Sequence, residues 1–122
     1  MDSNKDINMS SHLSKRHCVS CEGGIPPLTK EEIHTLSRQL TGWSVISDKK
    51  LEKEWKFKDF AQALAFTIQV GEIAEKEGHH PDIYLTWGKV KITLSTHAIN
   101  GLSENDFILA GKIDGISGSV CF

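Results

Sequence analysis

Three histidines are the residues of this chain best suited to proton transfer. His79 and His80 are adjacent and precede Pro81, and His97 follows later in the chain. Imidazole is the side chain whose unperturbed pKa lies nearest neutrality, so it gives and takes protons under cellular conditions. Three such side chains brought together would support acid–base catalysis or bind a metal ion.

The segment between these histidines predicts a β-hairpin. Residues 82–87 and 90–95 alternate between apolar and polar side chains, as half-buried strands do. Gly88-Lys89 between them suits a two-residue type II′ turn. The register that follows places the large apolar residues on one face, in the pairs Trp87 and Val90, Leu85 and Ile92, and Ile83 and Leu94.

The same register, carried outward, sets His80 opposite His97. Opposed residues of an antiparallel pair have Cβ atoms roughly 4.5–5.5 Å apart. Pro81 lacks an N–H group and should fray the pairing there. We therefore expect His79, His80 and His97 to cluster at one end of the hairpin, on or near its polar side.

Length and composition predict one ordinary domain. The chain has 122 residues, of which 39% are hydrophobic, enough for a single core. Its net charge is −2, which argues against a dedicated nucleic-acid surface. No apolar run approaches the roughly 20 residues of a membrane helix, and the N-terminus lacks the apolar stretch of a signal peptide. Three cysteines indicate no disulfide framework, so we expect a reducing, cytoplasmic location.

The polar, aperiodic residues 1–20 predict a flexible tail, followed by a single domain over residues 21–122. Cys18-Val-Ser-Cys21 has the spacing of a redox motif or of half a zinc site. The βαβ context of a redox motif is absent, and only weakly spaced histidines would complete a zinc site. We interpret this segment as a leader without essential chemistry.

The remaining pattern predicts the order α-β-β-α-β-β-α. This order favours an α+β fold, with a four-stranded antiparallel sheet and helices packed on one face. The helix from 60 to 77 has a broad apolar arc, which favours a homodimer or homotetramer. Besides the 82–95 hairpin, the expected elements are a helix from the capping box Thr29–Glu32 to about Leu40, strands at 43–47 and 51–58, a helix from cap Asp59 to about Glu77 with Gly78 as its stop, and a helix from cap Ser103 to about Ile116.

Seven residues stand at a spacing that resembles a known family signature: Glu75, His79-His80-Pro81, Trp87, His97 and Asp106. This spacing is similar to that of the pterin-4a-carbinolamine dehydratases. The resemblance covers residues 21 to about 116. It includes the flanking segments Leu28-Thr-Lys-Glu-Glu, Gly42-Trp43, Ile92-Thr-Leu-Ser-Thr-His97 and Gly101-Leu-Ser-Glu-Asn-Asp106, and a leader similar to that of bacterial and plant-organelle members.

The resemblance implies a hydro-lyase that dehydrates 4a-hydroxytetrahydropterin to quinonoid dihydropterin, with no cofactor and no metal. His79 and His97 would be the acid–base pair acting at the 4a-hydroxyl and at N5, and His80 would orient the pterin. The resemblance leaves open which of His79 and His97 is the acid. Positioned proton transfers of this kind contribute typically about 10²–10⁴-fold each. The reaction would recycle the cofactor of an aromatic amino acid hydroxylase.

Three further residues are candidates for binding or orienting the substrate. Glu75 lies one helical turn before His79 and could bond an imidazole. Trp43 and Trp87 could form flat apolar walls for the bicyclic ring. The plainer interpretations are a solvated helix face for Glu75 and a core position for Trp87. Asp106 is interpreted as a helix N-terminal carboxylate paired with Ser103.

Two other functions remain open. Animal members of this family act as dimerisation cofactors of a homeodomain transcription factor, so the chain could be a protein-binding scaffold with vestigial chemistry. The intact histidines favour the enzyme. The second alternative is a small metal-dependent hydrolase with a three-histidine site. Adjacent His79 and His80 tend to point apart, which disfavours shared ligation of a metal.

Overall fold

The computed structural model describes residues 26–119, and these confirm the predicted order of elements. The tail and the three cysteines lie outside this range. The helices are α2 (Lys30–Ser37), α3 (Phe60–Glu77) and α4 (Glu104–Ser119), with a short 3-10 helix η2 (His97–Ile99), and the strands are β1 (Ser44–Ile46), β2 (Lys50–Lys56), β3 (Asp82–Thr86) and β4 (Lys89–Leu94). No helix within residues 26–119 combines the length and apolar character that crossing a membrane requires.

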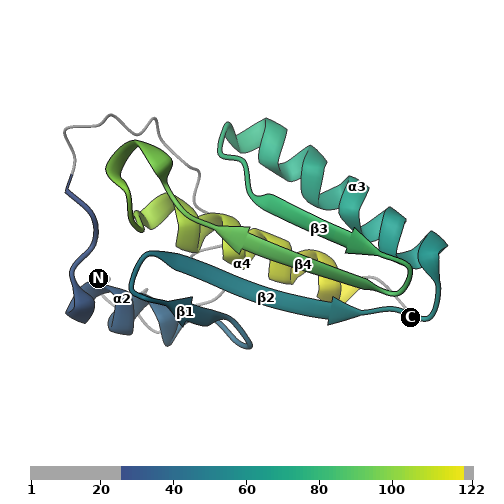
Figure 1. The fold of residues 1–122 in the computed structure, drawn as a ribbon, viewed down its shortest axis with the longest axis horizontal. Coiled ribbons are helices and arrows are strands. Elements are labelled where there is room, and N and C mark those ends of the chain that lie inside the picture. The colour runs from purple at the N-terminus through teal and green to yellow at the C-terminus, as the bar shows by residue number, and fades with distance from the viewer. Residues whose placement is uncertain (1–25, 120–122) are drawn as a thin grey trace, which may run out of the picture.

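The four strands form one antiparallel sheet in the order β1-β2-β4-β3, as predicted for the fold class. Figure 1 shows α4 crossing behind the sheet and α3 running beside β3. Along β4, fully buried Val90, Ile92 and Leu94 alternate with half-buried residues. The helices therefore cover one face of the sheet.

The core joins the helices to the two central strands. Phe66 of α3 and Phe107 of α4 are fully buried, as are Leu51 of β2 and Ile92 of β4. Burying one such side chain contributes roughly 1.5–3 kcal/mol. This packing holds α3 and α4 against the same face of the sheet.

The predicted caps at Thr29, Asp59 and Gly78 form, and Gly78 leads directly into the histidines. The side chain of Asp59 accepts a hydrogen bond from the Gln62 N–H at the start of α3. Gly78 has a φ of 67° at the C-terminus of α3, a left-handed conformation that glycine adopts without strain. This conformation ends the helix and turns the chain into His79. The capping box of Thr29 and Glu32 also forms, although α2 ends at Ser37 rather than near Leu40.

The hairpin register differs from the prediction by a shift of the turn. The turn residues are Trp87-Gly88, because Thr86 pairs with Lys89. The Gly88 carbonyl accepts a hydrogen bond from the Phe57 N–H at 2.8 Å. Ile83 therefore pairs with Ile92, and Leu85 pairs with Val90. The apolar residues still share one face, because each partner moves by two positions.

The shifted turn and the end of β4 correct two expectations. Trp87 lies in the turn with 68% of its surface exposed, so its interpretation as a core residue was wrong. β4 ends at Leu94 and His97 begins η2, so the pairing of His80 with His97 was also wrong. The physical reason is a closed loop: the Thr96 N–H donates to the Gly101 carbonyl at 2.8 Å, which bends the chain away from β3.

The beginning of the described chain packs against this loop. The Leu28 N–H donates to the Leu102 carbonyl at 2.9 Å. A Cβ atom built on Gly101 would lie 2.8 Å from the Cβ of Pro27. Glycine is therefore the residue that allows this close approach.

Candidate active site

His79, which follows the end of α3, forms a short hydrogen bond with the first turn of α4. Its Nε2 lies 2.6 Å from Oδ1 of Asp106, in the first turn of α4. The Asp106 side chain is fully buried, and 12% of the His79 side chain is exposed. One edge of the imidazole is therefore held by a buried carboxylate while the ring keeps a small opening to solvent.

The other oxygen of Asp106 is fixed by the loop before α4. Its Oδ2 accepts hydrogen bonds from Oγ1 of Thr96 at 2.8 Å and from the Ser103 N–H at 2.9 Å. Oγ1 of Thr96 lies 2.8 Å from Oγ of Ser103 as well. Because a carboxylate only accepts, Nε2 of His79 donates to it. In the tautomer that carries its proton on Nε2, the acceptor nitrogen of the ring is Nδ1.

This network brings the His97 segment next to His79. Thr96 binds the same carboxylate as His79, and neighbouring Cα atoms are about 3.8 Å apart. His97 is exposed and lines a pocket of about 250 Å³ beside Thr96. The carboxylate of Asp106 therefore connects His79 to the backbone segment that carries His97, although the hairpin pairing that predicted their proximity was wrong.

His80 follows His79 in the segment after α3, and its side chain is mostly exposed. Its Nε2 is 2.6 Å from Oε2 of Glu75, and both side chains are mostly exposed. Glu75 was expected to form a hydrogen bond with an imidazole. In the structure its partner is His80, whereas the partner of His79 is Asp106. The adjacent histidines thus have separate carboxylate partners.

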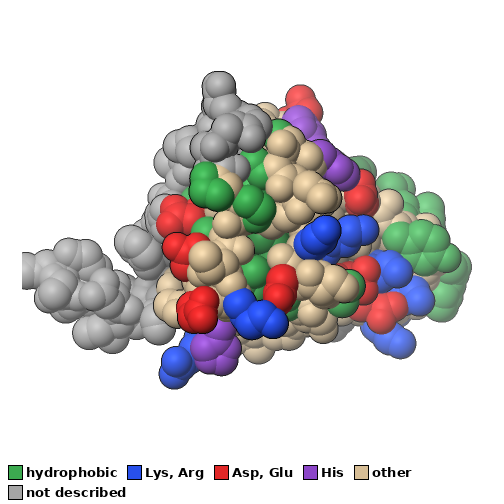
Figure 2. Space-filling view, turned by 60° about the vertical axis from the view of Figure 1, so that its left-hand side comes forward, with side chains coloured by type: hydrophobic (Ala, Val, Ile, Leu, Met, Phe, Trp, Pro, Cys, Tyr) green, Lys and Arg blue, Asp and Glu red, His purple; other side chains and the backbone are tan. Residues whose placement is uncertain are grey.

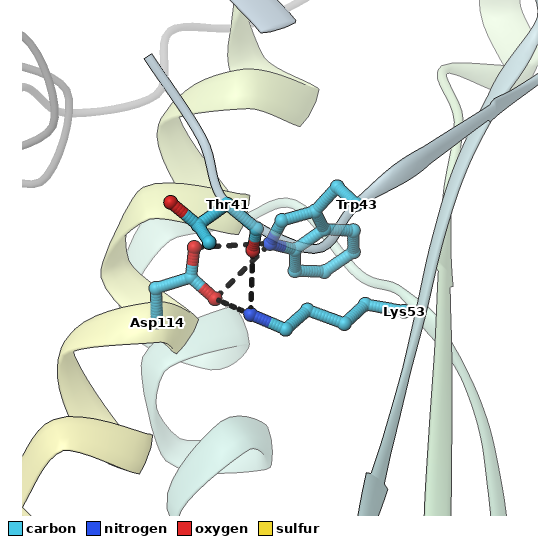
Figure 3. A network of polar contacts seen from close by, with 4 residues as sticks. All are labelled: Thr41, Trp43, Lys53 and Asp114. Atoms are coloured by element: carbon cyan, nitrogen blue, oxygen red, sulfur yellow. Dashed lines mark hydrogen bonds and ion pairs between the residues drawn. The ribbon is translucent and has the colours of Figure 1, made fainter. Parts of the chain in front are cut away.

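Trp43 lies away from the histidines in this chain. Its Nε1–H donates to the carboxylate of Asp114, and Nζ of Lys53 lies 2.8 Å from the same group and 2.7 Å from the Thr41 carbonyl, as Figure 3 shows. Asp114 follows Asp106 by 114 − 106 = 8 residues on α4, or about 12 Å at 1.5 Å per residue. The ring also packs edge-on against Trp55.

Trp87 is also separated from the histidines. It follows β3 at the turn, whereas His80 precedes that strand. Strand β3 has five residues, which span about 17 Å at 3.3 Å per residue. The structure of the single chain therefore brings together His79, His80, Glu75 and the His97 loop, but neither of the tryptophans expected as walls.

Asp106 is the site residue that sequence reasoning assigned to a purely structural role. Its pairing with Ser103 is present, as expected, but the same carboxylate also holds His79 and Thr96. The available signal was its fixed spacing after His97 in the family-like pattern. Within residues 26–119, no group of three or more His, Cys, Asp or Glu side chains is arranged to hold a metal ion.

Comparisons with known proteins agree on one family. Residues 26–116 match the family model described as pterin 4 alpha carbinolamine dehydratase. A relative from Alkaliphilus metalliredigens, named as a pterin-4-alpha-carbinolamine dehydratase, is 53% identical over 105 residues, 85% of this chain and 95% of that protein. A relative of the same name from Rubrobacter xylanophilus is 48% identical over 104 residues, 85% of this chain and 97% of that protein.

Two solved structures extend the comparison. The transcriptional coactivator/pterin dehydratase from Brucella melitensis is 36% identical, with a TM-score of 0.72 over 75% of this chain and 99% of that one. A pterin dehydratase-like protein described as a RuBisCO assembly factor in the alpha-carboxysome is 27% identical, with a TM-score of 0.55 over 65% of this chain and 93% of that one.

Proposed function

Because this chain belongs to the pterin-4a-carbinolamine dehydratase family, we propose that it converts 4a-hydroxytetrahydropterin into quinonoid dihydropterin and water by histidine acid–base catalysis. The observation that carries the proposal is the buried Asp106 carboxylate, which binds both His79 and the residue before His97. This shared carboxylate ties the segment of His97 to the ring of His79, which supports an acid–base pair formed by the two.

The reaction needs two proton transfers and no change of oxidation state. The C4a–O bond breaks, and the hydroxyl leaves as water after receiving a proton from an acid. A base removes the proton from N5, whose lone pair then forms the double bond to C4a. Either His79 or His97 serves as the acid and the other as the base. The Nε2 contact of His79 with Asp106 supports Nδ1 as its reacting atom.

His80 and Glu75 bind or orient the pterin beside this pair in our proposal. Both side chains are accessible, and their contact at 2.6 Å holds the second imidazole in one orientation. The quinonoid product can be reduced to the tetrahydropterin that an aromatic amino acid hydroxylase uses. We therefore propose that the protein serves such a hydroxylase by recycling its cofactor.

Turnover of purified protein tests the proposal. The substrate is generated in situ, and its dehydration is followed by ultraviolet absorbance. His79→Ala and His97→Ala should each lower turnover roughly 10²-fold or more, the usual scale for losing a positioned acid or base. The matched control is His34→Ala, because His34 is an exposed histidine on α2.

The result that would remove this mechanism is wild-type turnover in both His79→Ala and His97→Ala. Chelators should leave turnover intact. Loss of activity that added zinc restores would instead favour the metal-dependent hydrolase. These arms separate acid–base chemistry from metal chemistry at the same histidines.

A protein-binding role is the second candidate function. Phe60, Leu64 and Ile68 of α3 are exposed at helical spacing and form an apolar stripe. The names of the two structural relatives, a coactivator and an assembly factor, also favour contacts with other chains. We propose that this stripe supports a homodimer or homotetramer. Leu64→Glu should then lower the mass found by sedimentation, and an unchanged mass in a folded variant would contradict this.

A further inference from the structure

The pocket beside His97 is lined by two lysines on the side opposite the histidine. It is lined by the β1–β2 turn on one side and by the loop after β4 on the other, through Lys49, Lys50, Ser95, Thr96, His97, Asn100 and Gly101. Figure 2 shows one face of the molecule with basic side chains near its centre and histidine side chains above them. A pocket of about 250 Å³ is just below the ≈ 300–1,000 Å³ range of small-molecule sites.

The backbone holds the two lysines opposite the His97 loop. Leu51 of β2 pairs with Leu94 of β4, so the continued register sets Lys50 opposite Ser95. Ser47 and Asp48 have positive φ values, and the Lys49 N–H closes their turn on the Ile46 carbonyl at 2.9 Å. The position of the lysines beside His97 is therefore a property of the sheet.

The charge of this pocket is unbalanced. None of its lining residues is a carboxylate, and neither Lys49 nor Lys50 forms an ion pair with any residue between 26 and 119. The neighbouring carboxylate of Asp48 already lies 3.4 Å from Nζ of Lys30. By contrast, Lys53, Lys89 and Lys112 each have a carboxylate partner. Two unneutralised ammonium groups favour an anionic ligand.

The chemistry of the pterin indicates that its C6 substituent is the group nearest to this pocket. In a pterin, C6 is bonded to N5, and N5 is bonded to the reacting C4a. If His97 acts at N5 or at the 4a-hydroxyl, the C6 substituent leaves the ring within two bonds of the reacting atoms. Lys49 and Lys50 line the same pocket as His97, so a C6 substituent that enters this pocket lies within reach of both lysines.

We infer that the preferred substrate is a reduced pterin whose C6 side chain carries an anionic group, a phosphate or a carboxylate, bound by Lys49 and Lys50. This inference rests on the proposed dehydratase function, which by itself holds equally for a neutral side chain. The lysines contribute binding and selectivity, whereas the proton transfers stay with the histidines.

Binding of stable dihydropterins tests the inference without turnover. The probes share one ring and carry a hydroxymethyl, phosphorylated hydroxymethyl or carboxymethyl group at C6, and their affinities are measured by calorimetry. The wild-type protein should bind an anionic probe about tenfold tighter than the neutral one, a preference that weakens with added salt. The two anionic probes distinguish phosphate from carboxylate as the group recognised.

Matched lysine variants locate the preference. Lys49→Gln and Lys50→Gln should each reduce the affinity for the anionic probe several-fold and leave the affinity for the neutral probe unchanged. The control is Lys58→Gln, because Lys58 is an exposed lysine two residues beyond the end of β2, and the six steps from Lys50 to Lys56 already span about 20 Å at 3.3 Å per residue. Equal wild-type affinities, or a preference that survives in Lys49→Gln and Lys50→Gln, would overturn the inference.

Turnover measurements distinguish a failure of the inferred anion preference from a failure of the proposed dehydratase function. A protein that dehydrates neutral and anionic carbinolamines with equal kcat/KM is a dehydratase without this selectivity. A protein that neither binds nor dehydrates any of them lacks the proposed function itself. His97→Ala should lower kcat for both substrates and keep the anion preference in binding.

Discussion

At the scale of single residues, one buried carboxylate connects the parts of the candidate site. Asp106 accepts hydrogen bonds from His79, Thr96 and the Ser103 backbone, so its two oxygens serve both an imidazole and the start of α4. A buried carboxylate that accepts several hydrogen bonds keeps its donors in a fixed geometry, because no water is present to replace it as their acceptor. The orientation of His79 therefore depends on Asp106.

Replacing Asp106 by asparagine tests this dependence. An amide keeps the shape but offers one acceptor oxygen where the carboxylate offers two, so His79 and Thr96 compete for it. We expect Asp106→Asn to lower kcat by about 10²-fold or more while KM changes little, because the loss acts through the proton-transferring ring. Measured kinetics on folded protein, checked by circular dichroism, provide the readout.

The control for this prediction is Asp48→Asn, an identical chemical change at an exposed turn residue. Its turnover should equal that of the wild type. Wild-type kcat in a folded Asp106→Asn variant would show that His79 needs no carboxylate for catalysis.

Sequence reasoning identified the histidines but gave only part of the role of Asp106. A helix N-terminus with Ser103 three residues before an aspartate explains that aspartate locally, and this contact does form. The contact with His79 joins residues 27 positions apart in the chain and depends on how α3 and α4 pack. No local pattern contains that information.

At the scale of elements, a polar cluster ties the sheet to the middle of α4. Asp114 of α4 binds Lys53 of β2 and the indole N–H of Trp43, and Lys53 also donates to the Thr41 carbonyl. Both charged side chains are largely shielded, with 18% of Lys53 and 24% of Asp114 exposed. Such a partly buried ion pair is screened less than the exposed pair of Lys30 and Asp48.

Asp114→Asn should therefore destabilise the protein more than Asp48→Asn does. We expect a loss of about 1–3 kcal/mol in unfolding free energy for Asp114→Asn, the range for removing one charged partner from a shielded hydrogen-bonded group. Asp48→Asn should cost less than about 1 kcal/mol. Urea denaturation followed by tryptophan fluorescence measures both, and equal losses would contradict the shielding argument.

The element order was predictable because each element carries its own periodicity and caps. The alternation along β4 and the Asp59 and Gly78 caps of α3 are local features, and all of them form as expected. The hairpin turn was placed one residue late, and its Gly88 also bonds to Phe57, a contact with a residue distant in sequence that no local pattern contains. The loop carrying His97 was taken for strand because its closure depends on the pairing of Thr96 with Gly101.

At the scale of the whole molecule, the region that matches the family begins at residue 26. The core side chains Ile33, Phe66, Ile92 and Phe107 all lie after this point. The folding free energy of the domain should therefore come from residues beyond the predicted tail.

Deleting residues 1–17 is expected to leave the unfolding free energy within about 0.5 kcal/mol of the wild-type value, as for changes that touch no packed feature. Chemical denaturation of both proteins measures this difference, and turnover should also be retained. A broad loss of circular dichroism in the shortened protein would show that the tail is part of the folded domain.

The contact of Gly101 with Pro27 has a consequence for how this sequence can vary. A methyl group at position 101 would lie 2.8 Å from the Cβ of the proline, closer than packed carbon atoms approach. Substitutions at the two positions are therefore coupled. In natural variants, a larger residue at position 101 should be found together with a displaced or smaller residue at position 27. Covariation between the two positions would then reveal this contact, which neither position indicates by itself.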